Sequence, residues 1–223
     1  LNIHGGPRAQ YGRTFYREMY VLAQAGYVVM YTNPRGSQGY GKRFSKSIEG
    51  KWAEPAMSDL MAAVDHAISL GYVDKNRLGV TGGSYGGYMT NWIVTHTDRF
   101  KAAVTQRSVS DLSSMFGNSD IGWDLVWEFS GPPWEKRETY LKWSPMTYIN
   151  KCNTPLLIIH SEFDLRCNIE QADQIFTALK YLKREVEYIR FPDEPHGLSR
   201  HGRPDRREAR LKFILGWFDK YLK

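Results

Sequence analysis

Short apolar runs alternate with longer amphipathic stretches along the whole of this sequence. The runs have the length of buried strands, and they lie at residues 1–4, 27–32, 77–81, 102–106, 155–160 and 186–191. Two of the intervening stretches, 57–68 and 211–222, carry apolar residues at helical spacing. This order predicts an α/β fold in which helices cover both faces of a mostly parallel sheet.

One segment, residues 108–143, interrupts this alternation. It contains no convincing strand, and its aromatic residues lie among Gly, Ser, Pro and acidic residues. In a two-layer domain such an insertion usually packs over the edge or the carboxyl end of the sheet, as a lid or a pocket wall. We expect part of it to line a substrate pocket, with plain packing as the alternative. The candidate pocket residues are Phe116, Trp123, Trp127 and Phe129.

The composition fits one domain without a membrane span. The chain has 223 residues, of which 42% are hydrophobic, and a net charge of +6. Much of the positive charge lies in residues 200–210, where acids are interspersed and a helix begins. We therefore expect a solvated helix face there and no nucleic-acid partner. No apolar run approaches the roughly 18 residues that a membrane span needs, so no membrane partner is expected.

The two cysteines, Cys152 and Cys167, flank the predicted strand at 155–160. A strand of that length is about 20 Å long, whereas a disulfide needs Cα atoms within about 7 Å. We therefore predict free thiols. No Cys/His cluster has metal-ligand spacing, and we expect neither a metal nor a cofactor.

The strongest chemical signal is the segment GGSYGG at residues 82–87, which contains a Gly-x-Ser-x-Gly motif. It follows the predicted strand at 77–81 and precedes apolar residues at helical spacing from Tyr88 to Ile93. A serine at such a strand-to-helix turn is exposed as a nucleophile, because glycines allow the strained turn. We predict that Ser84 is a nucleophile.

A serine nucleophile needs a base and an orienting acid, and in this topology both follow later strands. His196 follows the strand at 186–191 through a turn-rich segment and is the preferred base, with His201 as the alternative. Asp164 follows the strand at 155–160 and is the preferred acid, with Glu162 as its rival. The remaining downstream histidines, His96 and His160, are expected to be structural.

Two backbone N–H groups should stabilise the oxyanion. One belongs to Tyr85, which follows the nucleophile at a helix N-terminus. For the other we choose Gly6, in the loop His4-Gly5-Gly6-Pro7 directly after the first predicted strand, because a residue without a side chain lets the backbone approach a substrate carbonyl.

With these motifs in place, the chain resembles the catalytic domain of the prolyl oligopeptidase family, and within it the acylaminoacyl-peptidase-like branch. The resemblance covers nearly all 223 residues. It rests on HGGP at 4–7, YTNPRGS at 31–37 with GYG at 39–41, GGSYGG at 82–87, HSEFDLRC at 160–167 and FPDEPH at 191–196. It implies an α/β-hydrolase fold, a triad of Ser84, Asp164 and His196, and an oxyanion hole at Gly6 and Tyr85. The loop at 31–37 looks like a structural signature, and we expect Arg35 to pair with a carboxylate.

The resemblance implies a serine peptidase that hydrolyses short peptides, N-acylated ones included, through an acyl-enzyme. A carboxylesterase is the alternative, because ester and amide hydrolysis share one tetrahedral intermediate. A non-catalytic binding module would lack a triad residue, and all three are present. We expect a cytoplasmic enzyme, and a homo-oligomer is a further arrangement to consider.

Two departures from the family pattern stand out. Ser161 occupies a position where the family usually has Gly. The β-propeller that precedes the catalytic domain in family members is absent, and the sequence opens directly on the strand before the oxyanion loop. We interpret residues 1–223 as the catalytic part of a longer chain with an N-terminal propeller, the first strands of the sheet being missing.

Overall fold

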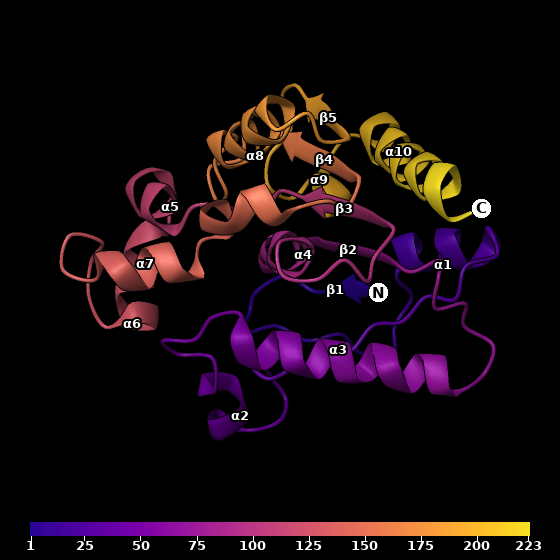
Figure 1. The fold of residues 1–223 in the computed structure, drawn as a ribbon. Coiled ribbons are helices and arrows are strands. Elements are labelled where there is room, and N and C mark those ends of the chain that lie inside the picture. Colours follow the sequence, from indigo (N-terminus) through magenta and orange to yellow (C-terminus); the bar gives the residue numbers. More distant parts are fainter.

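The computed structural model describes residues 1–223 and contains one five-stranded sheet (Figure 1). The strands lie in the order β1-β2-β3-β4-β5, and all four neighbouring pairs are parallel. Their bounds are β1 Asn2–Ile3, β2 Gly79–Gly83, β3 Ala102–Gln106, β4 Leu156–Ser161 and β5 Val186–Phe191. The prediction of a parallel sheet is confirmed.

Helices cover both faces of this sheet, because successive side chains of each strand point to opposite sides. In β4, Leu156 and Ile158 belong to one apolar core, whereas Leu157 and Ile159 belong to the other. In Figure 1, α4 and α8 lie to the left of the strands, and α1 and α10 lie to the right. The first core is covered by α3 (Glu54–Ser69), α4 (Tyr85–Val94) and α8 (Glu170–Tyr181), and the second by α1 (Arg17–Gln24), α9 (Leu198–His201) and α10 (Pro204–Leu222).

The predicted strand at 27–32 is wrong as a strand of the sheet. The segment forms only one isolated bridge, between Tyr31 and Asn2, together with a hydrogen bond from Asn2 N to Met30 O. Its neighbour β1 has only two residues, so the rest of the segment finds no ladder to join. The strands predicted at 102–106 and 186–191 match β3 and β5, and the bounds of the three others differ from the prediction by one or two residues.

The segment that interrupts the alternation folds into short helices beside α4, on the left of Figure 1. They are α5 (Leu112–Asn118), the 3₁₀ turn η1 (Gly122–Asp124), α6 (Leu125–Phe129) and α7 (Arg137–Trp143), and the 3₁₀ turn η2 (Pro145–Lys151) follows the segment. Asp111 caps α5 by accepting hydrogen bonds from the Ser113 and Ser114 N–H groups. The remaining helix, α2 (Lys42–Lys46), lies apart from the sheet.

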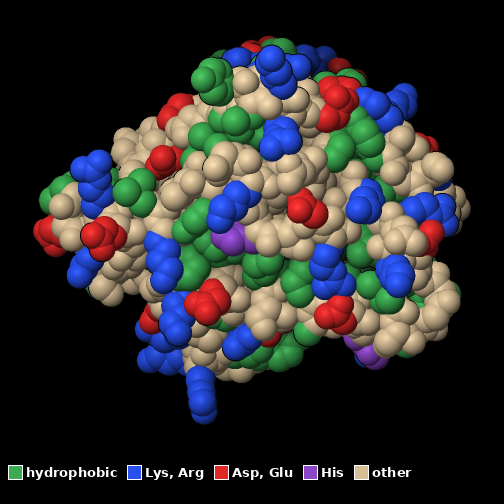
Figure 2. All heavy atoms as spheres, viewed as in Figure 1, with side chains coloured by type: hydrophobic (Ala, Val, Ile, Leu, Met, Phe, Trp, Pro, Cys, Tyr) green, Lys and Arg blue, Asp and Glu red, His purple; other side chains and the backbone are tan.

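The surface is mixed in charge, and the two cysteines lie inside the fold. On the face shown in Figure 2, Lys and Arg side chains are interspersed with Asp and Glu over most of the surface. Cys152 and Cys167 are both buried free thiols. None of the helices combines the length and the apolar character that crossing a membrane demands.

Candidate active site

Ser84 lies at the sharp turn between β2 and α4. Its backbone has φ 61° and ψ −124°, a strained conformation for a residue with a side chain. The turn is held because the Ser84 N–H donates to the carbonyl oxygens of Gln106 (3.0 Å) and Arg107 (3.1 Å), at the end of β3. The strand, turn and helix therefore occur in the order that the sequence predicts.

Two glycines make this turn sterically feasible. A Cβ atom added to Gly86 would overlap the carbonyl oxygen of Ile3, and one added to Gly82 would overlap the carbonyl oxygen of Gly86. Both obstacles are backbone atoms, which cannot move aside as a flexible side chain can. The motif thus brings α4 into close contact with β1 and β2.

Asp164 and His196 are paired in the structure. Nδ1 of His196 donates a hydrogen bond to Oδ2 of Asp164 over 2.7 Å. Oδ1 of Asp164 accepts from the backbone N–H groups of Arg166 (3.0 Å) and Cys167 (2.8 Å). The carboxylate is buried and is fixed from both sides, so it holds the imidazole in one orientation and one tautomer.

The surroundings of His196 favour its neutral form. Burial lowers the pKa of His196 below its ordinary value of 6.5, and the Asp164 carboxylate opposes this shift. The positive charges of Arg107 and Arg166 lower the pKa further. A neutral imidazole near pH 7 is the form that can accept a proton from a serine.

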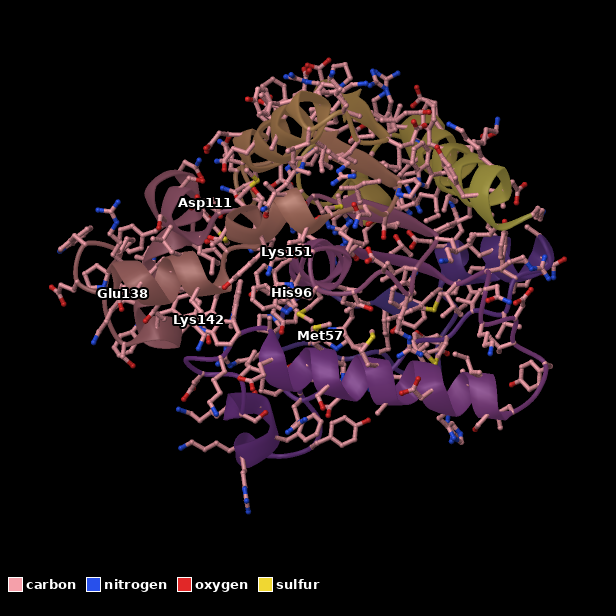
Figure 3. All side chains as sticks on the ribbon, viewed as in Figure 1. Met57, His96, Asp111, Glu138, Lys142 and Lys151 are labelled. Atoms are coloured by element: carbon pink, nitrogen blue, oxygen red, sulfur yellow. The ribbon has the colours of Figure 1, made fainter.

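The alternatives for the acid and the base lie elsewhere. Glu162 is exposed and pairs with Arg190 on β5, at 3.2 Å. His201 is exposed on α9. His96 follows the end of α4 (Figure 3). Its ring stacks on Trp92 at a centroid distance of 3.9 Å.

His160 lies closer to the pair than the sequence suggests. It is fully buried, donates Nε2–H to the Cys167 carbonyl oxygen over 2.7 Å, and lies 3.5 Å from Oδ2 of Asp164. Burial raises the pKa of the neighbouring Cys167 thiol, and contact with the Ser84 hydroxyl partly opposes this rise. No hydrogen bond joins Ser84 to His196 in the structure, although both side chains line one cavity.

The loop that carries Gly6 lies against the serine. A Cβ atom added to Gly5 would lie 3.2 Å from Cβ of Ser84. Gly6 has φ +127°, which favours glycine. Its N–H donates to no acceptor within the protein. The Tyr85 N–H is the first of α4, where N–H groups have no partner within the helix.

Two residues that the sequence reasoning missed hold this loop in place. Nε2 of His4 is hydrogen-bonded to Oγ of Ser37 at 2.8 Å, and both side chains are buried. The HGGP motif and the loop at 31–37 are separate in the sequence, and nothing local in either indicates that they meet. In the same loop Arg35 forms the expected carboxylate pair, with Asp59, at 2.8 Å from Nη2 to Oδ1.

Ser84 and His196 open into a cavity of about 800 Å³. The segment at 108–143 lines it with Val109, Met115 and Ile121. None of the four predicted pocket aromatics lines the cavity. Trp123 and Trp127 are 62% and 76% exposed, whereas Phe129 is buried against Trp52 and Tyr140, and Phe116 packs against the same core. The short helices turn these rings toward solvent or into the core, away from Ser84.

The model of the prolyl oligopeptidase family matches residues 13–223. The chain belongs to the prolyl oligopeptidase family. This family of serine peptidases has the α/β-hydrolase fold in its catalytic domain, and the parallel sheet with helices on both faces has that architecture here.

Relatives within the prolyl oligopeptidase family are similar over the whole chain. An uncharacterized peptidase, YuxL, of Bacillus subtilis is 51% identical over 100% of this chain and 34% of its own length. Dipeptidyl-peptidase 5 of Schizosaccharomyces pombe is 33% identical over 99% of this chain and 33% of its own. The structure of Pyrococcus horikoshii acylaminoacyl peptidase superimposes with a TM-score of 0.95 at 36% identity, over 99% of this chain and 36% of that one. The chain thus spans about a third of the length of these relatives.

Proposed function

We propose that this chain carries the acyl-transfer site of a serine peptidase that hydrolyses short peptides, N-acylated ones included. The observation that carries the proposal is the buried Asp164 carboxylate, 2.7 Å from Nδ1 of His196, in the cavity that also contains Ser84 at its strained turn. The names of the relatives support it, since they include an acylaminoacyl peptidase and a dipeptidyl-peptidase.

In the first half of the proposed reaction, Oγ of Ser84 attacks the carbonyl carbon of the scissile bond while Nε2 of His196 takes the hydroxyl proton. Asp164 stabilises the imidazolium that forms. The oxyanion of the tetrahedral intermediate accepts hydrogen bonds from the N–H groups of Gly6 and Tyr85. The intermediate collapses when His196 returns the proton to the leaving amine, and the acyl group stays on Ser84.

In the second half, a water molecule takes the place of the leaving amine. His196 accepts its proton, the hydroxide attacks the acyl-enzyme, and the same two N–H groups hold the second oxyanion. Collapse returns the proton from His196 to Oγ of Ser84 and releases the acid. No residue other than these is needed to balance the protons.

The apolar part of the cavity indicates which acyl residue fits. Val109, Met115 and Ile121 lie on this wall and carry no charge. A side chain next to the scissile bond gains free energy by leaving water for such a surface, about 25 cal/mol per Å². We therefore propose an apolar residue on the acyl side of the scissile bond.

Labelling with a fluorophosphonate tests the assignment of Ser84. The probe should modify the full-length protein at Ser84, and Ser84→Ala should abolish labelling. Ser199→Ala is the matched control, because Ser199 is the other serine that lines the cavity, and it should be labelled like the wild type. Labelling that persists in Ser84→Ala would exclude Ser84 as the nucleophile.

Matched substrates separate the peptidase from the carboxylesterase. The same acyl group is offered as an anilide and as an alkyl ester, and kcat/KM is compared between them. Turnover of the anilide and of unmodified short peptides is the expected result. An enzyme that hydrolyses only the ester would be a carboxylesterase.

A further inference from the structure

The cavity at Ser84 is lined by many more cations than anions. Its single carboxylate is Glu18, and no other acidic side chain lines it. Six arginines do: Arg17, Arg107, Arg166, Arg200, Arg207 and Arg210. An imbalance of this size produces a positive potential inside a concave site, where low-dielectric walls concentrate the field.

Only two of these six arginines form an ion pair within the protein. Arg210 pairs with Glu18 (2.6 Å) and Arg166 pairs with Asp120 (2.6 Å). The side chains of the other four make neither an ion pair nor a hydrogen bond, and the Nε atoms of Arg107 and Arg207 are buried without a partner. A buried cation without an anion is costly. The cavity is therefore suited to an anion supplied from outside.

Arg107 lies near two of the other arginines, Arg210 and Arg200, whose charges act on it. It directly follows β3 and has φ 37°, a conformation uncommon for a residue with a side chain. Its guanidinium packs on Gly83, the residue before Ser84, because a Cβ atom added to Gly83 would lie 2.6 Å from Cζ of Arg107. Burial, together with the charges of Arg210 and Arg200, lowers the pKa of Arg107 to about 10. Arg107 nevertheless remains a cation near pH 7.

The chemistry of His196 indicates which part of the substrate lies next to these charges. This residue must give its proton to the leaving amine, so the leaving part of the substrate lies on its side of Ser84. Arg200 and Arg207 come shortly after His196 in the chain, on α9 and α10, and line the same cavity. The wall from the segment at 108–143 is apolar by contrast.

We propose that Arg107, with Arg200 and Arg207, binds the free C-terminal carboxylate of the leaving part of the substrate, so that short peptides ending close after the scissile bond are preferred. This inference rests on the proposed function and names the substrate class of the same site. A guanidinium offers several N–H donors in a plane, which match the two oxygens of a carboxylate.

Four substrates with one acyl group test this in the full-length protein. They are acetyl-Phe-Ala, its C-terminal amide, acetyl-Phe-Glu amide and acetyl-Phe-Gln amide. We expect kcat/KM for the free acid to exceed that for its amide by about tenfold or more, the usual effect of hydrogen bonds to a charged group. Equal values would overturn the proposal. If the enzyme preferred only acetyl-Phe-Glu amide over acetyl-Phe-Gln amide, we would conclude that the arginines bind an acidic side chain of the substrate and not its C-terminal carboxylate.

Variants identify the residues responsible. Arg107→Met should reduce the ratio of kcat/KM for the free acid to that for its amide to about two or less. Arg107→Lys should retain part of this ratio, because lysine keeps the charge but lacks the planar set of N–H donors. Arg43→Met, an exposed arginine on α2, is the matched control and should keep the full ratio. Arg200→Met changes an exposed side chain, and it should lower the ratio even if Arg107→Met does not fold. An unchanged ratio in both Arg107→Met and Arg200→Met would overturn the assignment.

Hydrolysis of the amide substrate by Ser84→Ala distinguishes a failure of the carboxylate site from a failure of the proposed function. If Ser84→Ala hydrolyses the amide substrate like the wild type, the site itself is misassigned. If hydrolysis of the amide depends on Ser84 while acid and amide are hydrolysed equally, only the carboxylate site is wrong.

Discussion

Oδ2 of Asp164 and Nδ1 of His196 lie 2.7 Å apart, and the carboxylate is almost completely buried. Replacing Asp164 with Asn keeps the shape but presents an amide, which can hold the imidazole in the wrong tautomer. We expect kcat of Asp164→Asn to fall by about 10⁴-fold. Steady-state kinetics on a chromogenic acyl anilide measure this change.

Glu162→Gln is the control for that substitution. Glu162 lies two residues from Asp164 in the chain, is exposed and pairs with Arg190 at the surface. Its kcat should remain within about twofold of the wild type, because exposed ion pairs contribute little. If the two variants lost activity equally, the acid would be misassigned.

The rate should depend on the protonation of His196. Burial and the charges of Arg107 and Arg166 lower its pKa below the ordinary 6.5. Only the neutral imidazole can accept the proton of Ser84, so kcat/KM falls as the pH drops through this pKa. The acidic limb of the pH profile should therefore lie below pH 6.5.

Arg166→Gln tests whether the charge of Arg166 contributes to the lowered pKa of His196. Removing a cation near His196 makes its protonated form less unfavourable, so the pKa should rise and the acidic limb should move to higher pH. Arg43→Gln, on the exposed face of α2, should leave the limb where it is. A limb that stays in place in Arg166→Gln would show that the charge of Arg166 does not contribute to the pKa of His196.

Most of the fold could be predicted from local patterns, because buried parallel strands are short apolar runs. Residues 27–32 are the exception. Whether they join the sheet depends on the length of the neighbouring strand β1, and the apolar pattern of residues 27–32 gives no information about that length. The order of Ser84, Asp164 and His196 could also be predicted, since each follows a recognisable strand and the carboxyl ends of parallel strands share one edge of the sheet.

The cavity walls could not be predicted in the same way. Trp123 and Trp127 are aromatic residues in an insertion, but the packing of the short helices decides which way each ring points. The charged run at 200–210 was expected to be solvated, and that is wrong for Arg210, which is buried against Glu18. This partner lies 192 residues away in the chain, so no local pattern reveals the pair.

The glycines of the turn should be intolerant of even one methyl group. Gly86→Ala would place Cβ onto the carbonyl oxygen of Ile3, and the backbone would have to shift. Overpacking of this kind costs about 1–3 kcal/mol. Urea denaturation should show a lower free energy of unfolding for Gly86→Ala.

Gly216→Ala is the matched control. Gly216 lies in α10, where it is exposed and an added Cβ atom would meet nothing within 4 Å. Alanine has the higher helix propensity, so this variant should gain about 0.5–1 kcal/mol. A loss of stability at both positions would mean that close approach to Ile3 is not the cause at Gly86.

The pair of Arg210 and Glu18 should stabilise the contact between α10 and α1. Nη1 of Arg210 lies 2.6 Å from Oε2 of Glu18, and Arg210 is only 5% exposed. Burial raises the pKa of Glu18, but the charge and hydrogen bond of Arg210, with smaller contributions from Asn2 and Arg107, together lower it below its ordinary value of 4.5. In Arg210→Met the carboxylate loses its counter-ion, and removing one partner of a buried pair costs about 3–5 kcal/mol.

Urea denaturation at two pH values tests this pairing. A carboxylate with a lowered pKa stabilises the folded state above the pKa it has when unfolded, and this contribution is lost as the pH falls through the folded value. The deficit of Arg210→Met relative to the wild type should therefore be full at pH 7 and shrink well below pH 4.5. The double variant Glu18→Gln with Arg210→Met should recover part of the loss at pH 7, because residue 18 is no longer a buried carboxylate without its counter-ion. A deficit that is the same at both pH values, with no recovery in the double variant, would assign the role of Arg210 to packing of its aliphatic stem.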